Sequence, residues 1–243
     1  GVNMLPLPTI KSKDSIFYVT LPSNEKKIPF RRMKVSEEKI LLLAKQAADS
    51  TEIHSAILQV TALCCEDKGL DIVSLPIFDL EYAYLKIRGQ SVSNIMTVTY
   101  SDLEDNKDYV VNINIEDVKV QGLKKPEEFK IMFDVSNGIQ MKYPAATLYN
   151  DKGFLEQGKD AYQRLMIKCI DKIFTVDDVF LASDYTEEDL IKWLDDLELV
   201  NFNLIDKFVS TLPVISYEAK YKNTMGTERS ISLSTLNDFF MLV

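Results

Sequence analysis

The sequence IPFRRMKVSEEKILLLAKQA, residues 28–47, joins a strand pattern to a helix pattern. Its first residues complete a pair of apolar arms, IFYVTL (16–21) and KIPFRR (27–32), which flank a polar PSNEK turn. Two such arms around a polar turn predict a β-hairpin, and Pro29 restricts the second arm to the edge of a sheet. The chain is therefore expected to begin its fold with a short hairpin.

The same stretch then changes from a strand pattern to a helix pattern. Ser36 is expected to cap the helix, because Glu37 and Glu38 follow in its first turn, where the helix dipole favours acidic side chains. The basic pair Arg31–Arg32 lies at this passage from strand to helix. We interpret it as charge on an edge strand, where charge discourages unwanted pairing, and as a rim available to an acidic partner.

Further elements follow from the period of the apolar residues. We expect helices over 51–65, 76–90, 161–174, 186–197 and 202–212, and hairpins over 95–115, 129–144 and 214–234. This segregated order predicts an α+β fold with an N-terminal β-hairpin and helical layer, a central antiparallel sheet, a second helical layer and a C-terminal β-hairpin. The corresponding division is 1–92, 93–144 and 145–243, in one or two compact domains overall.

Composition excludes several classes of protein. The 243 residues include 28 basic and 37 acidic side chains, a net charge of −9, which argues against binding nucleic acid. No apolar run approaches the ~20 residues of a membrane span, and the N-terminus lacks the apolar segment of a signal peptide. Three cysteines, two of them adjacent, favour a reduced, cytosolic setting without disulfides.

The charge is unevenly distributed along the chain. Residues 1–34 carry seven basic and two acidic side chains, whereas 175–206 carry ten acidic side chains and one lysine. Net charges of +5 and −9 follow for these two segments. Opposed segments of this kind can attract each other or attract neighbouring molecules.

The sequence offers little catalytic chemistry. His54 is the only histidine and is expected to be a packing or surface residue, and the cysteines cannot assemble a zinc site. No glycine-rich phosphate loop is present. The acids Asp102, Glu104 and Asp105 lack the spacing of a calcium loop, so we interpret them as solvated turn charge. We expect no cofactor, no bound metal and no catalytic residues.

The segment TEEDLIKWLDDLELV (186–200) is the strongest candidate for a docking surface. Its apolar side includes Trp193, and its other side is strongly acidic. It can be a capped helix packed on the core, which we favour, or a docking helix with Trp193 as its anchor, since tryptophan is enriched at interface hot spots. The aromatic pair Phe239–Phe240 near the C-terminus is a second candidate anchor.

Two longer blocks carry a family resemblance. LPSNEKKIPFRRMKVSEEKILLLAKQA (21–47) and SLPIFDLEYAYLKIRGQSV (74–92) resemble the hairpin-to-helix start and the following helix of baseplate hub and hub assembly proteins of T-even-like tailed bacteriophages. GIQMKYP (138–144) and LNDFF (236–240) resemble a strand and the aromatic end of that family. The helix at 76–90 is expected to be core, with Phe78, Tyr82 and Leu85 on its buried face.

One departure from the family concerns the last hairpin. The resemblance implies a C-x-x-C-G turn that grips a metal in relatives, whereas this chain has Lys222-Asn-Thr-Met-Gly226. With the glycine kept and the thiols absent, we expect hydrophobic packing to hold this hairpin instead of a metal.

The resemblance implies a non-enzymatic hub component, or a hub assembly factor or chaperone, that contacts other baseplate hub or tape-measure proteins. It also implies a location in the host cytoplasm during assembly and in the tail baseplate of the virion. The candidate partner-binding residues are Arg31, Arg32, Trp193, Phe239 and Phe240. The alternatives are a carboxylate-based hydrolase, which requires acids converging in one pocket with raised pKa values, and a regulatory adaptor of the host cell. The oligomeric state is left open.

Overall fold

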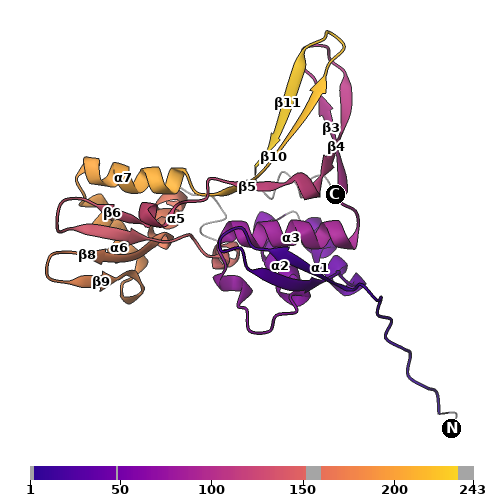
Figure 1. The fold of residues 1–243 in the computed structure, drawn as a ribbon, viewed down its shortest axis with the longest axis horizontal. Coiled ribbons are helices and arrows are strands. Elements are labelled where there is room, and N and C mark those ends of the chain that lie inside the picture. Colours follow the sequence, from indigo (N-terminus) through magenta and orange to yellow (C-terminus); the bar gives the residue numbers. More distant parts are fainter. Residues whose placement is uncertain (1–2, 48, 152–159, 235–243) are drawn as a thin grey trace.

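The computed structural model of the protein describes residues 3–47, 49–151 and 160–234. Within these ranges the fold is α+β, as the sequence predicts, because helices and antiparallel strands occupy separate stretches of the chain. Two hydrophobic clusters are buried, one around α3 and one around the β7–β8 pair, and they are called here the N-terminal core and the distal core. Figure 1 shows the two parts beside each other, with a pair of hairpins projecting from the N-terminal part.

The predicted first hairpin is confirmed, and three helices complete the N-terminal core. These elements are β1 (Ile16–Thr20), β2 (Lys27–Arg31), α1 (Val35–Gln46), α2 (Ser50–Cys64) and α3 (Ile77–Ser91). Leu21 and Phe30 are completely buried at the hairpin. The turn is fixed to α3, because Ser23 donates hydrogen bonds from its backbone N–H (3.0 Å) and its hydroxyl to the buried carboxylate of Asp79.

The predicted cap of α1 is wrong by two residues. Lys34 is the capping residue, in an extended conformation, and its backbone N–H donates to Glu37 Oε2 at 3.0 Å. Ser36 lies inside the first turn and donates to the same oxygen at 3.0 Å. The reason is the buried Glu37, whose carboxylate satisfies the start of the helix from within and leaves no role for a serine cap.

Helix α3 is core, as predicted, but its aromatic residues are buried to different degrees. Phe78, Tyr84 and Leu85 are almost completely buried, whereas Tyr82 is only partly buried. The Lys86 ammonium lies 5.1 Å from the centre of the Tyr82 ring. Tyr82 therefore lies at the margin of the core, and the fully buried aromatic residues of α3 are Phe78 and Tyr84.

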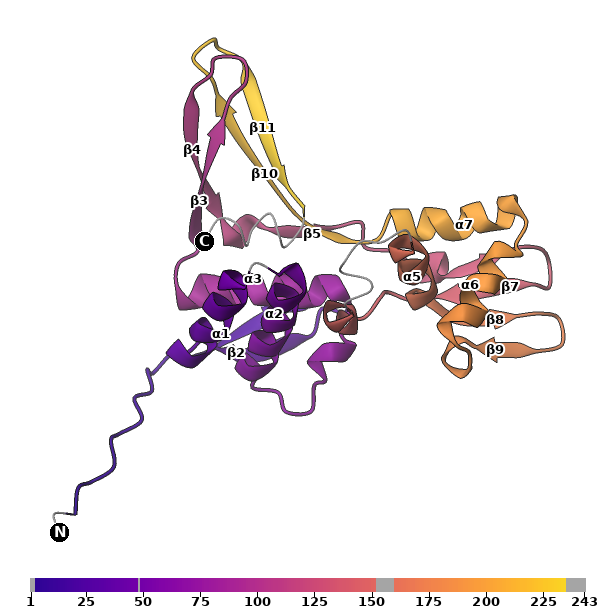
Figure 2. The same ribbon diagram turned by 180° about the vertical axis from the view of Figure 1, so that it is seen from behind.

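Two hairpins, β3–β4 and β10–β11, rise side by side from the N-terminal part (Figures 1 and 2). Their strands are β3 (Ile95–Ser101), β4 (Asp108–Asn114), β10 (Val214–Lys222) and β11 (Glu228–Leu233), and we call the four together the stalk. At its base β10 also pairs with β5 (Lys119–Gln121). Alternate side chains, including Met96, Ile113 and Ile215, are buried and join the stalk base to the N-terminal core.

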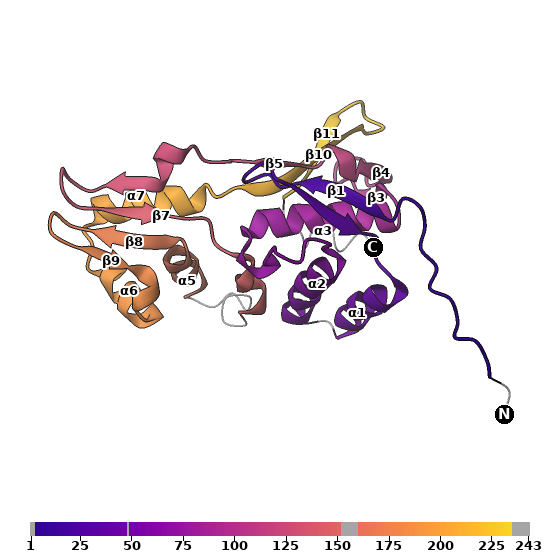
Figure 3. The same cartoon turned by 60° about the horizontal axis from the view of Figure 1, so that its bottom comes forward.

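The distal core lies under a four-stranded antiparallel sheet in the order β6-β7-β8-β9. Its elements are β6 (Lys130–Met132), β7 (Gly138–Met141), α5 (Ala161–Lys168), β8 (Ile170–Phe174), β9 (Val179–Leu181), α6 (Glu187–Asp195) and α7 (Leu199–Ser210). Figure 3 shows the helices α5 and α6 beside this sheet and the chain before β1 at the opposite end of the molecule. Gly138 is required at its position, since a Cβ there would lie 2.5 Å from the Ile131 carbonyl oxygen and 2.6 Å from the Phe174 ring.

The helix predicted over 161–174 is wrong in its second half. Helix α5 ends at Lys168, and Ile170–Phe174 forms β8, paired with β7 on one side and β9 on the other. The apolar spacing of Ile170 and Ile173 fits a helix, but strand pairing on both sides overrides that local pattern. The remaining short elements are 3₁₀ turns, namely Ile72–Ser74, Ile115–Asp117, Pro126–Phe129, Ala146–Asn150 and Ala182–Asp184.

A row of aromatic rings joins the two cores. Phe78 of α3 meets Tyr143 edge to face at 4.9 Å, Tyr143 meets Phe129 at 5.0 Å, and Phe129 meets Phe208 of α7 at 5.6 Å between ring centres. Edge-to-face pairs at these distances are favourable beyond the area that they bury. The aromatic row therefore connects α3 with α7 of the distal part. None of the helices in the described ranges has the length and apolarity of a transmembrane span.

Candidate functional site

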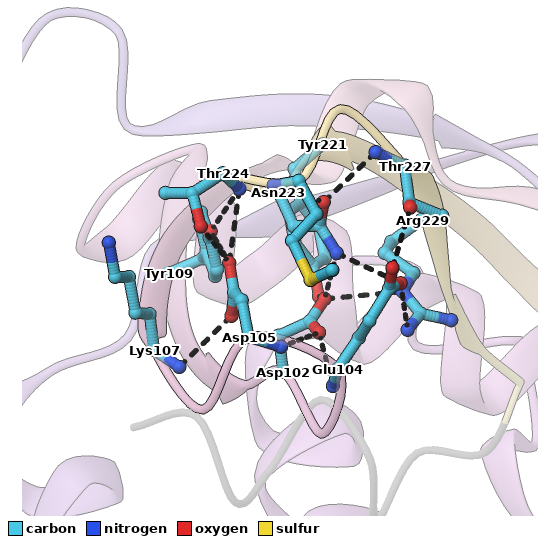
Figure 4. A network of polar contacts seen from close by, with 11 residues as sticks. Asp102, Glu104, Asp105, Lys107, Tyr109, Tyr221, Asn223, Thr224, Thr227 and Arg229 are labelled. Carbon is cyan, nitrogen blue, oxygen red and sulfur yellow. Dashed lines mark hydrogen bonds and ion pairs between the residues drawn. The ribbon is translucent and has the colours of Figure 1, made fainter.

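The loop between β3 and β4, at the far end of the stalk, is folded by its own acidic residues. The Asp102 N–H donates to the Lys107 carbonyl at 2.9 Å, and Asn106 takes a left-handed conformation (φ 56°) that closes the loop. Asp102 Oδ1 accepts the backbone N–H of Glu104 at 2.8 Å. The loop thereby presents the carboxylates of Asp102, Glu104 and Asp105 to the second hairpin (Figure 4).

The facing turn, between β10 and β11, is organised by Asn223. This side chain is buried, and its Oδ1 accepts the backbone N–H groups of Met225 at 3.0 Å and Thr227 at 2.9 Å. Gly226 has φ of 80°, which explains why the turn needs a glycine. Asn223 Nδ2 is then free to donate toward the acidic loop, 3.2 Å from Glu104 Oε2.

Asp102 is the buried centre of the contact between the two turns. Its side chain is only 1% exposed, and its Oδ2 accepts the Tyr221 hydroxyl at 2.7 Å and Arg229 Nε at 3.2 Å. The same guanidinium reaches Glu104 Oε2 through Nη2 at 2.8 Å. One arginine of β11 thus bridges two carboxylates of the opposite loop, a charge-assisted arrangement with fixed geometry.

Asp105 binds the second turn on its other side. Its Oδ2 accepts the backbone N–H of Thr224 at 3.0 Å and the Thr224 hydroxyl at 2.8 Å, and it also accepts the Tyr109 hydroxyl. Thr227 completes the set by donating to Glu104 Oε1 at 3.0 Å. We call these residues the tip network: Asp102, Glu104, Asp105, Tyr109, Tyr221, Asn223, Thr224, Thr227 and Arg229.

The electrostatics of the tip network favour ionised carboxylates. The hydrogen bond from Tyr221 is the main reason that the pKa of Asp102 lies below its ordinary value. Burial alone would raise the pKa of Asp105, but hydrogen bonds from Tyr109 and Thr224 outweigh it and lower this pKa. Burial and the bond to Asp102 raise the pKa of Tyr221. The network therefore holds charged acceptors against neutral and cationic donors, which suits a structural fastening.

The tip network overturns two expectations from the sequence. The acids at 102–105 are not solvated turn charge, and the turn of the last hairpin is held by polar contacts as well as by packing of the Tyr109 and Tyr221 rings, whose centres lie 4.6 Å apart. The partners lie about 120 residues apart in sequence, with separations of 119 for Asp105–Thr224 and 125 for Glu104–Arg229. In the sequence, the contact between the two turns is indicated by an acid-rich turn in one hairpin and by a second hairpin that carries an arginine and an asparagine but no thiols.

The pH dependence of stability should report the ionisation of Asp102. A carboxyl group whose pKa is lowered by folding contributes stability above its unfolded value of 3.8 and loses it as the pH falls through the lower folded value. The melting temperature of Asp102→Asn should therefore lie below that of wild type at pH 7, and the difference should shrink as the pH falls below about 4. The exposed Asp117→Asn variant serves as the control and should follow wild type throughout. A difference in melting temperature between wild type and D102N that does not change with pH would show that the charge of Asp102 contributes nothing to stability.

Of the predicted partner residues, Arg31 and Arg32 have different environments. The Arg31 side chain is 19% exposed, pairs with the buried Glu37 and donates to the Leu63 carbonyl at 3.1 Å. It also lies 3.7 Å from Glu66. Arg31 thus ties β2 to α1 and to the end of α2, whereas Arg32 is exposed.

Trp193 lies on α6 and is partly buried against the distal core, with its ring 6.3 Å from that of Phe133. It lines a cavity between α6 and the β8–β9 hairpin. The structure does not bring it together with Arg31 and Arg32, which belong to the N-terminal part. Phe239 and Phe240 lie outside the described residues.

The cysteines and the histidine lie in packed surroundings. Cys64, Cys65 and Cys169 are buried and free, and burial raises the pKa of the Cys64 thiol to about 11 and that of Cys169 to about 12. His54 packs edge to face against Tyr149 at 4.6 Å, as the sequence suggests. Over the described part of the chain, no cluster of three or more histidine, cysteine or acidic side chains could hold a metal ion.

The family of the chain follows from its sequence taken with this architecture. A family model described as "T4 bacteriophage base plate protein" matches residues 14–241, which include both cores and the whole stalk. No curated protein and no solved structure gives a significant match. The resemblance carried by the first hairpin, α1 and α3 is thus confirmed, over residues 14–241, as a resemblance to T4-like phage baseplate proteins. The chain belongs to the T4 bacteriophage base plate protein family.

Proposed function

We propose that this chain works in the baseplate hub, as a hub component or as an assembly factor for the hub, through protein–protein contacts rather than catalysis. Membership of a baseplate protein family gives a structural role in the phage tail. The hub assignment goes further and rests on the resemblance of residues 21–47 and 74–92 to hub proteins. The expected partners are other hub proteins or the tape-measure protein, first met in the host cytoplasm while the baseplate assembles.

The observation that supports contact-based function best is the stalk tip. The tip network fixes two turns against each other, and beyond it two apolar side chains point into solvent, Leu103 at 86% and Met225 at 64% exposure. Apolar groups that are held out on a rigid support lose little conformational freedom when a partner covers them. The carboxylates nearby already accept hydrogen bonds within the tip network, which favours a docking element over a hydrolase.

Co-expression of the chain with each hub and tape-measure protein of its phage, followed by pull-down, tests the proposal. We expect one of these proteins to be retained by wild type and lost with Leu103→Ser combined with Met225→Ser. The control is Val135→Ser, which removes another exposed apolar side chain, from the β6–β7 turn of the distal part. Retention of none of these proteins by the wild-type chain would contradict the hub assignment.

The charge asymmetry should influence how quickly a partner binds. Arg32 is exposed, so Arg32→Glu should slow association several-fold at low salt and leave dissociation nearly unchanged, because rim charges act mainly on the encounter rate. Arg31 is unsuitable for this test, since it holds Glu37. Lys192→Glu changes the net charge equally within the acidic segment and is the control. Surface plasmon resonance measures the binding kinetics. An association rate that changes neither with salt nor with Arg32→Glu would show that the basic rim takes no part in binding.

A further inference from the structure

A cavity of about 410 Å³ opens between α6 and the β8–β9 hairpin of the distal part. Its lining is mostly apolar and aromatic, with Ile173, Phe180, Tyr185, Leu190 and Trp193 around it. A volume of this size lies in the range of pockets that take small ligands or a few side chains. We call it the distal groove.

The strand beside the distal groove is an uncovered sheet edge. Strand β9 is last in the order β6-β7-β8-β9, and within the described residues no strand pairs with its outer side. All three of its residues are apolar and exposed: Val179, Phe180 and Leu181. An exposed apolar edge is a template for an added strand, and proteins usually protect such edges with charge or proline.

The rim of the distal groove is acidic. Asp189 lines the groove itself, and five further acids lie in the adjoining turns and the start of α6, namely Asp177, Asp178, Asp184, Glu187 and Glu188. Among these, Glu187 is paired with Lys168 at 2.9 Å. The groove therefore suits an extended apolar segment that carries positive charge.

The chain itself contains such a segment, MLPLPTIKSK (residues 4–13), which we call the arm. Residues 4–12 form neither helix nor strand, and Met4, Leu5, Leu7 and Ile10 are all at least 85% exposed. Lys11 and Lys13 are its only charged residues. Figures 1–3 show the arm leaving the body away from the rest of the N-terminal part.

The proline positions of the arm match the requirements of an edge strand. Pro6 and Pro8 alternate with Leu5 and Leu7, and in a strand neighbouring residues turn their N–H groups to opposite sides. The leucines can therefore bond to β9 while the prolines face outward, the side on which a missing N–H is tolerated and further strand addition is blocked. Leu5 and Leu7 would also point to the same face of the sheet, where Ile173 and Phe180 line the groove.

The arm does not reach the distal groove of its own chain. All three views place the arm and β9 at opposite ends of the molecule (Figures 1–3). We propose that the arm of one copy adds to β9 of a second copy, with Leu5 and Leu7 in the distal groove and Lys11 and Lys13 against its acidic rim. Such a head-to-tail contact is heterologous, so it builds a ring if the rotation closes and an open chain if it does not. The inference is independent of the hub assignment.

Self-association of the full chain is the first test. The mass measured by light scattering should rise with protein concentration for wild type and should stay that of one chain for Leu5→Ser combined with Leu7→Ser. Exposed positions on the arm can be changed without loss of folding, since their side chains lie in solvent. Phe180→Ser, on the groove side, should have the same effect as the arm variant.

Trp193 provides a direct signal for the second test, because it is the only tryptophan of the chain and lines the groove. A synthetic peptide of residues 4–13, titrated into the full-length L5S/L7S protein, should shift the Trp193 emission to shorter wavelength and saturate. Serine at the two leucine positions of the peptide should weaken binding by at least a hundredfold, because both buried leucines are lost and each tenfold change corresponds to about 1.4 kcal/mol. Glutamate at the two lysine positions should weaken it several-fold at low salt.

Two results would overturn the proposal. One is a wild-type mass that the arm and groove variants leave unchanged at every concentration. The other is Trp193 emission that does not respond to the peptide, including the case in which another tail protein shifts it, since the groove would then belong to a different partner.

Discussion

Replacing Phe78 with alanine is expected to lower the free energy of unfolding by about 3–5 kcal/mol, the usual cost of truncating a buried aromatic residue. Phe78 is 1% exposed and begins the aromatic row through Tyr143 and Phe129 to Phe208. The variant loses its own contacts and also weakens the junction between the two cores. Urea unfolding followed by circular dichroism measures the loss.

Tyr82→Ala is the matched control for Phe78→Ala, because both residues lie on α3 and both are aromatic. Tyr82 is only partly buried, so its truncation should cost clearly less, a smaller effect than the sequence alone suggests. Equal losses for the two variants would show that burial along α3 does not decide their contributions.

Glu37→Ala is expected to have the second large effect. Removing one partner of a buried ion pair costs about 3–5 kcal/mol, because the remaining charge loses its compensation. Glu37 is 2% exposed and holds the Arg31 guanidinium, and the same carboxylate caps α1 through the Lys34 N–H. The low end of that range is the more realistic value here, since Arg31 keeps part of its exposure to water and a second partner in Glu66.

The control for Glu37→Ala is Glu38→Ala, which removes the neighbouring acid from the same helical turn. Glu38 forms no ion pair with Arg31 in the structure and should cost less than about 1 kcal/mol. Burial raises the pKa of Glu37, but hydrogen bonds from Arg31 and Ser36 and the charge of Arg31 leave it below its ordinary value of 4.5. Thermal unfolding of both variants at neutral pH compares the two acids, and equal melting temperatures would contradict the structural role of Glu37.

The sequence predicts local elements well where the pattern and the pairing agree. The hairpins at 95–115 and 129–144 have clear alternation around turns rich in polar residues, and both form. The sequence also predicts the change from β2 to α1. It does not predict the capping residue, because Glu37 acts through a buried ion pair. The proposed division into 1–92, 93–144 and 145–243 stays a prediction.

The sequence does not predict what depends on distant pairing. Residues 170–174 fit a helical period, and only the neighbouring strands β7 and β9 make them a strand. Similarly, an acidic turn read alone is most simply solvated, and nothing local to Asp102 indicates that Tyr221 and Arg229 will surround it. Sheet register and buried charge are set by tertiary contacts, which a local pattern does not contain.

The tip network holds the β10–β11 turn in place at the end of the stalk. Here Asn223 orders the turn from within, and Asp105 and Glu104 hold it from the facing loop. Leu103 and Met225 are thereby held outward at the end of the stalk.

The proposed function depends on contact through the stalk tip. It is tested most directly by sedimentation of tail intermediates from cells infected with phage that encodes Leu103→Asp together with Met225→Asp. Both side chains are exposed, so the variant chain should fold and melt like wild type. We expect hub proteins to sediment as unassembled species and complete baseplates to be depleted. Baseplates of normal yield and sedimentation, formed with this variant, would contradict a function through the stalk tip.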